Sequence, residues 1–397
     1  MVVTGALGFA RFGYAMILPA MQDDLGLTNS QMGLLASGNL IGYMAFTLIA
    51  GVLATKYGQR ITVGLSMAAT ATALTLTGAV RSFGAALAMR TLTGIGSGGA
   101  NVPTMSLCTA WFAPERRGTA AGIMAAGSGI GLISTGLLVP QLRLLYGDLG
   151  WRYAWYLLGL LTFSIAAAAY VTLRNRPAKK GATTVGGELH KHLEDYDPPE
   201  PVRWAAVYKS PALLQLGLTY FMYGFSYIIY ATFFAAYLEK EAGLTPLAAG
   251  ELWLLAGVLS IFSGFIWGTF SDRVGRRYGL ATTYLLLATS FLLLATVKSL
   301  EGFCSSAIIF GLTAWAVPTI MAAASGDCVG PRMAPAALAF ITTVFFGAGQ
   351  SMAPYVAGYM KDATGTFAPA FLLAAAAATV GAILALLPRK PCKPSEQ

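Results

Sequence analysis

Two arginines lie inside long apolar segments, where a charge is costly. Arg11 falls within the apolar segment 4–22, and Arg90 falls within the segment 84–112. A guanidinium at the centre of a membrane-spanning helix costs about 2.5–3.5 kcal/mol on insertion scales, so another interaction must offset this cost. Because guanidinium groups form paired hydrogen bonds with carboxylates and phosphates, Arg11 is a candidate for binding an anion. The alternative is that its long side chain reaches up to the lipid head groups.

The acidic residues have the opposite distribution. None of the 17 Asp and Glu residues lies in the middle third of an apolar segment, and both histidines, His190 and His192, lie in a polar stretch. Carriers of cations usually pair the substrate with a carboxylate inside the membrane, so this pattern favours an anionic substrate. The four cysteines have no metal-ligand spacing, and no nucleophile–base set or nucleotide loop is present. We therefore expect no enzyme activity, no metal and no cofactor.

Polar and aromatic side chains in the apolar segments could complete a binding site around Arg11. Tyr14 follows Arg11 by three residues and would share its helix face. A tyrosine offers a hydroxyl group together with an apolar ring, although each of these residues could instead pack between helices or mark the membrane interface. The candidate substrate-binding residues are Arg11, Tyr14, Asn39, Tyr43, Tyr223, Tyr227, Trp253, Trp315, Gln350 and Tyr355.

The segments that hold these residues are suited to crossing a bilayer. Of the 397 residues, 56% are hydrophobic and only 11% are charged, whereas a soluble domain carries roughly 25% charged residues. A crossing helix takes about 20 apolar residues, and such segments recur twelve times along the chain. They lack the alternation of barrel strands. We predict an all-α integral membrane protein with twelve transmembrane helices.

The basic residues predict the orientation of these helices. Eighteen of the 26 Lys and Arg residues fall on the side of the two termini, six on the opposite side and two inside spans. Because basic residues favour the cytoplasmic side, both termini are expected to be cytoplasmic. The net charge of +9 thus reflects topology and not a basic face for nucleic acid. The expected partners are a small-molecule substrate and the lipid bilayer, and we expect a monomer.

The chain also repeats itself. A shift of 217 residues superposes Gly26-Leu27-Thr28 on Gly243-Leu244-Thr245, Gly58 on Gly275, Arg60 on Arg277 and Gly94 on Gly311. We predict two pseudo-symmetric six-helix halves, 1–173 and 209–397, joined by a cytoplasmic linker, 174–208. Repeats of this kind place a substrate site between the halves, near the bilayer midplane.

Three motifs carry a family resemblance. The segment from Gly268 to Arg277, with Asp272, Arg273 and Arg276, resembles the loop signature of the major facilitator superfamily, and Gly51 to Arg60 is an altered copy with Thr55 in place of the family's Asp. The segment Arg90-Thr91-Leu92-Thr93-Gly94-Ile95-Gly96 resembles the family's fourth-span arginine motif, and Phe9 to Pro19 is similar to the opening helix of a poorly characterised bacterial branch. The resemblance implies gating or coupling roles for Gly51, Arg60, Arg90, Gly268, Asp272, Arg273 and Arg276.

The resemblance implies a secondary active transporter that works by alternating access. Together with Arg11, it predicts transport of a small organic anion, such as a monocarboxylate, across a bacterial inner membrane. Two alternatives remain open. One is an exporter of drugs or amphipathic compounds, which the aromatic residues would suit. The other is a substrate sensor that has the carrier fold and transports nothing.

Overall fold

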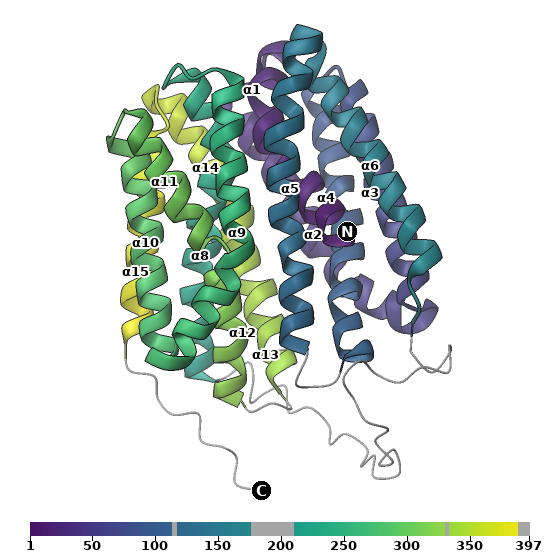
Figure 1. The fold of residues 1–397 in the computed structure, drawn as a ribbon, viewed down its shortest axis with the longest axis vertical. Coiled ribbons are helices and arrows are strands. Elements are labelled where there is room, and N and C mark those ends of the chain that lie inside the picture. Colours follow the sequence, from purple (N-terminus) through teal and green to yellow (C-terminus); the bar gives the residue numbers. More distant parts are fainter. Residues whose placement is uncertain (113–116, 176–209, 330–332, 388–397) are drawn as a thin grey trace, which may run out of the picture.

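The computed structural model describes residues 1–112, 117–175, 210–329 and 333–387. Figure 1 shows the helices of these ranges in two groups that lie side by side. Together they form twelve rods, which confirms the predicted fold class, and eight helical segments are individually long and apolar enough to cross a membrane. Most of the predicted linker, with both histidines, lies outside the described residues.

The first group contains η1 (Thr4–Phe12), α1 (Gly13–Leu25), α2 (Asn29–Tyr57), α3 (Gln59–Ala79), α4 (Phe83–Trp111), α5 (Arg117–Tyr146), the short η3 (Gly147–Leu149) and α6 (Gly150–Thr172). The second contains α8 (Pro211–Lys240), α9 (Pro246–Val274), α10 (Arg276–Thr296), α11 (Leu300–Thr313), α12 (Ala316–Val329), α13 (Ala334–Phe340), η5 (Ile341–Phe346), α14 (Gly347–Thr364) and α15 (Ala368–Leu386). Each group thus supplies six rods.

The two groups repeat the same contacts at the sequence offset of 217 residues. Arg60 Nε donates a hydrogen bond to the Tyr170 carbonyl at the end of α6, at 2.6 Å, and the Arg277 guanidinium donates to the Leu386 carbonyl at the end of α15. Gly94 lies against the backbone of Asn39, and its counterpart Gly311 lies against Ala256, the counterpart of Asn39. The internal repeat therefore extends to helix packing.

Two glycines of the first half allow a test of this packing. A Cβ atom added at Gly94 would lie 1.9 Å from the Asn39 carbonyl oxygen, whereas one added at Gly51 would meet nothing within 4 Å. Because α2 and α4 would have to separate, we expect Gly94→Ala to lower the free energy of unfolding by about 1–3 kcal/mol. Gly51→Ala should leave it nearly unchanged. Denaturant titration of the two detergent-purified variants measures the difference, and equal effects would contradict the close packing of α2 on α4.

Three of the twelve rods are interrupted. The π-helix η1 becomes α-helical at Gly13, the rod of α11 and α12 breaks at Ala314 and Trp315, and the π-helix η5 lies between α13 and α14. π-Helical turns are frequent at functional sites. Irregular backbone at membrane depth also needs protein or water to satisfy its polar groups. These interruptions therefore mark the region of a candidate site.

One end of the bundle, which we name the closed end, holds the two halves together by charged side chains. It is the upper end in Figure 1. Each link joins a helix of the first half to α8 or α14 of the second, so none can persist if the halves separate at this end. The links are the ion pair of Arg143 with Glu239 at 2.8 Å, the ion pair of Asp23 with Lys240, and the hydrogen bonds of 2.5–3.0 Å that Asp362 accepts from Asn29 and Ser30.

Candidate substrate site

Arg11 extends from η1 to the second half of the protein. Its Nη1 donates to Gln350 Oε1 of α14 at 3.4 Å, and its guanidinium lies 4.6 Å from the ring centre of Tyr43 in α2. Its Nε and Nη2 are buried and have no hydrogen-bond partner. Because 3.4 Å is long for an N–H···O bond, most of the donor capacity of Arg11 is open to an acceptor group.

Gln350 connects Arg11 to the aromatic side chains of α8. The Tyr227 hydroxyl donates to the same Oε1 atom at 3.3 Å, while the buried Gln350 Nε2 has no partner. The Tyr227 ring stacks on Tyr223, with 4.7 Å between ring centres, and Phe346 of η5 stacks on both. The site therefore has an apolar aromatic wall beside unpaired N–H donors.

The break between α11 and α12 brings Trp315 to this site. The Tyr223 hydroxyl donates to the Ala314 carbonyl, and the Trp315 backbone N–H donates to Ser263 Oγ at 3.1 Å, so these two backbone groups at the break have partners. The Trp315 ring packs on Phe12, the neighbour of Arg11, with 5.4 Å between ring centres. Its buried Nε1 has no partner.

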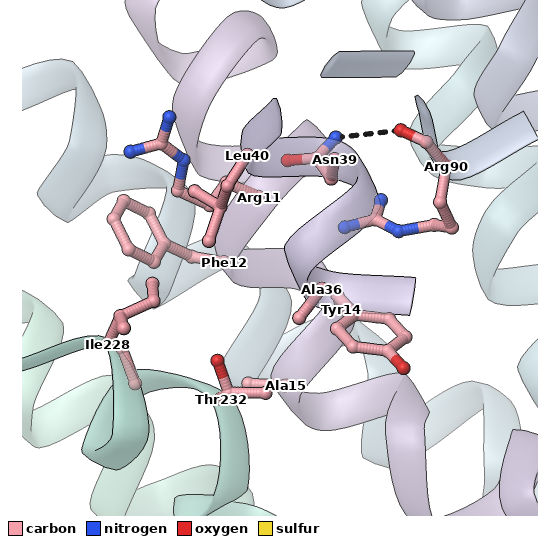
Figure 2. Close-up of a pocket in the computed structure, with 11 residues that line it drawn as sticks. Arg11, Phe12, Tyr14, Ala15, Ala36, Asn39, Leu40, Arg90, Ile228 and Thr232 are labelled. Atoms are coloured by element: carbon pink, nitrogen blue, oxygen red, sulfur yellow. Dashed lines mark hydrogen bonds between the residues drawn. The ribbon is translucent and has the colours of Figure 1, made fainter. Parts of the chain in front are cut away.

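Arg90 anchors the helix that carries Arg11. Its side chain is 1% exposed, its Nη1 donates to the Ala10 carbonyl at 2.7 Å, and its guanidinium lies 4.6 Å from the Tyr14 ring centre. Asn39 Nδ2 donates to the Arg90 carbonyl at 3.1 Å. Figure 2 shows the Arg11 guanidinium extending away from Arg90, so the two charges do not converge on one point.

The cavity among these residues is small. Its volume is about 10 Å³, and Arg11, Arg90, Tyr14 and Asn39 line it together with residues of α8 such as Thr232. A space of this size holds about one water molecule. This cavity is therefore too small for an organic substrate in this conformation.

The structure brings together six of the ten predicted substrate-binding residues: Arg11, Tyr43, Tyr223, Tyr227, Trp315 and Gln350. Two others, Tyr14 and Asn39, contact Arg90 and line the small cavity together with Arg11. The shared helix face of Arg11 and Tyr14 stays a prediction. Trp253 packs on Phe234 inside the second half, and Tyr355 is 42% exposed.

A comparison with known families decides the identity of the fold. The family model described as "Uncharacterised MFS-type transporter YbfB" matches residues 3–386. The chain belongs to this family of the major facilitator superfamily. It is therefore a multi-pass membrane transporter and not an enzyme.

Relatives within the superfamily match along most of the chain. A hexuronate transporter of Bacillus subtilis (strain 168) is 24% identical, covering 92% of this chain and 87% of its own length. A probable sulfoacetate transporter of Cupriavidus necator is 25% identical, covering 95% and 89%. Among solved structures, a bacterial homologue of the human lysosomal transporter Spinster, inward-facing and unoccupied, has a TM-score of 0.74 at 16% identity and covers 97% and 93%.

The signature loop of the major facilitator superfamily contacts only its own half among the described residues. Asp272 pairs with Arg276, which also pairs with Asp327 at 3.2 Å, and Arg273 is exposed. A latch from Asp272 to the first half therefore stays a prediction for another conformation. A Cβ atom added at Gly268 would meet only a Thr319 methyl group at 3.5 Å, an ordinary contact, so no other helix packs closely on Gly268.

Sequence reasoning missed two kinds of functional residue. Phe12 and Phe346 carry no signal of their own, because phenylalanine is common in spans and only the fold places them beside Arg11 and Gln350. For the closed end, the sequence does contain a signal, which is the run of three charged residues Glu239-Lys240-Glu241. These three residues contact Arg143, Asp23 and Lys361 respectively.

Proposed function

We propose that the protein is a secondary active transporter that moves a small organic anion across a bacterial inner membrane by alternating access. Arg11 binds the anionic group, and the tyrosines of α8 close the site. The closed end is then the periplasmic side, because the basic loops lie at the opposite end. Opening and closing of the two ends in turn would expose Arg11 to each side of the membrane.

The observation that carries this proposal is the unsatisfied guanidinium of Arg11 at the contact between the halves. Its buried Nε and Nη2 have no partner, and Nη1 donates to a neutral amide oxygen at the long distance of 3.4 Å. Buried donors without acceptors cost free energy. A carboxylate or sulfonate would supply charged acceptors that fit the planar guanidinium.

The named relatives support an organic anion. Hexuronates and sulfoacetate are both organic acids, and their transporters match this chain over nearly its whole length. Unpaired donors on Gln350 and Trp315 would suit a substrate with additional oxygen atoms, such as a hydroxylated acid.

The two alternatives fit the site less well. An exporter of cationic drugs needs a carboxylate in its cavity, and the described carboxylates near α8 pair with basic residues at the closed end. A sensor with this fold would bind the anion without moving it. Flux measurements distinguish this sensor from a transporter.

The test is a ligand screen of the purified, full-length protein. A ligand that binds the folded state raises the unfolding temperature. We expect D-glucuronate, sulfoacetate or other small carboxylates to stabilise the protein, and sugars and cationic dyes to have no effect. A stabilising anion should then be taken up by proteoliposomes. Stabilisation by cationic dyes alone would refute the proposal, and binding without uptake would favour the sensor.

A further inference from the structure

The membrane-embedded arginines have no acidic counter-ion. In the described ranges, each carboxylate that has a basic partner is paired with Arg143, Arg152, Lys240, Arg276 or Lys361, and Asp362 binds the start of α2. The other described acids, Asp148, Glu251 and Glu301, are exposed. Neither Arg11 nor Arg90 therefore has a carboxylate within ion-pair distance among these residues.

The two arginines differ in what they contact. Arg90 is held within the first half by the Ala10 carbonyl and by the rings of Tyr14 and Trp155. Its surroundings would move with it as one body. Arg11 contacts both halves, because it lies over Tyr43 of the first and donates to Gln350 of the second. Only the environment of Arg11 must change when the halves move relative to each other.

A neutral amide compensates the charge of Arg11 poorly. The single donated bond is 3.4 Å long, and two of the three guanidinium nitrogens are buried without a partner. During a change of access, both ends are closed and water is excluded. An isolated charge is then at its most costly, since the protein interior replaces hydration only through partners.

We propose that this transporter exchanges anions, because its empty form changes access much more slowly than its loaded form. This inference rests on the proposed function. A bound anion supplies the counter-charge of Arg11 in both directions, so each inward passage is followed by the outward passage of another anion. An uncompensated charge that raises the barrier by only about 1.4 kcal/mol slows the empty step about tenfold.

A substitution of Gln350 tests whether the uncompensated charge of Arg11 slows the access change of the empty form. Its Oε1 is the atom that both Arg11 and Tyr227 approach. In Gln350→Glu a carboxylate replaces the amide with the same shape and gives Arg11 a counter-ion that belongs to the protein. The empty form of this variant should change access more readily, at the cost of weaker binding of the external anion.

The experiment measures efflux from proteoliposomes loaded with labelled D-glucuronate, or with labelled sulfoacetate if the screen selects it. The pH is equal on both sides, and the membrane potential is set to zero with valinomycin and equal potassium. Efflux into medium with the same unlabelled anion reports exchange, and efflux into medium without it reports net transport. For the wild type we expect exchange to be at least about tenfold faster than net transport.

Two variants test whether the charge of Arg11 sets the ratio of exchange to net transport. In Gln350→Glu we expect net efflux to rise above the wild-type value and the ratio of exchange to net transport to approach one. Gln141→Glu makes the same chemical change at an exposed position of α5 and should keep the wild-type ratio. Equal exchange and net rates in the wild type would overturn the inference. If the ratio of exchange to net transport is unchanged in Gln350→Glu, or if both fluxes are lost, the charge of Arg11 is not what slows the empty form.

The two proposals fail separately. If no small organic anion stabilises the protein in the screen, the proposed function fails. If an anion binds and is transported, but net efflux is as fast as exchange, only the exchange inference fails.

Discussion

Replacing Arg11 with glutamine is expected to abolish measurable binding and transport of the organic anion. Glutamine keeps hydrogen-bonding capacity but removes the charge and the planar pair of donors. Losing one partner of a buried charge pair costs about 2–5 kcal/mol, so the affinity should fall at least about 30-fold. Thermal-shift titration with the anion selected by the screen measures this loss.

Two further variants make the result specific to Arg11. Arg11→Lys keeps the charge and loses the fork geometry, so intermediate affinity is expected. Lys298→Gln removes one positive charge at an exposed position and should leave the affinity unchanged. Wild-type affinity in Arg11→Gln would show that Arg11 only anchors the first helix, and equal losses in Lys298→Gln would point to a general effect of net charge.

The helices and the repeat could be predicted from sequence because they depend on local properties. Hydrophobic length identifies the rods, and the constant offset that pairs Gly94 with Gly311 reappears as equivalent packing on α2 and α9. Arg11 could be singled out for a similar reason, since a charge in an apolar segment is visible without the fold.

The interruptions of the helices could not be predicted, because contacts from distant parts of the chain satisfy them. Arg90 donates to the Ala10 carbonyl across 80 residues of sequence, and Tyr223 donates to the Ala314 carbonyl across 91. Hydrophobic periodicity does not record such contacts.

The ion pairs of the closed end could not be predicted either. Each charged residue there reads as an ordinary helix terminus in the sequence. The pairing of these residues depends on how the end of α8 packs against three other helices. Glu239 contacts α5, Lys240 contacts α1 and Glu241 contacts α14. Charge pairs between distant segments therefore need the fold before they can be assigned a gating role.

The second large effect is expected at the closed end, for Arg143→Gln. Arg143 and Glu239 form a 2.8 Å ion pair between the halves, and their side chains are only 15% and 8% exposed. Without Arg143, the sheltered Glu239 carboxylate loses its partner, and opening of this end would let water reach it. Breaking one partner of such a pair costs about 2–5 kcal/mol, so the equilibrium should shift at least about 30-fold toward opening.

Distance measurements between spin labels can report this shift. Asp148 and Glu301 are exposed positions at the closed end, one in each half. Labels at cysteines introduced there, with the four native cysteines replaced by serine, should give a single distance in the parent protein. Arg143→Gln should add a longer distance, whereas Asp272→Asn, at the opposite end of the bundle, should not.

A double variant separates an unpaired charge from a merely weakened contact. Removing both members of a buried ion pair costs less than removing one, because no charge is left without a partner. We therefore expect Arg143→Gln combined with Glu239→Gln to show less of the longer distance than Arg143→Gln alone. If the double variant opens as much as the single one, the ion pair acts only as a contact, and the cost of an isolated Glu239 carboxylate does not control this gate.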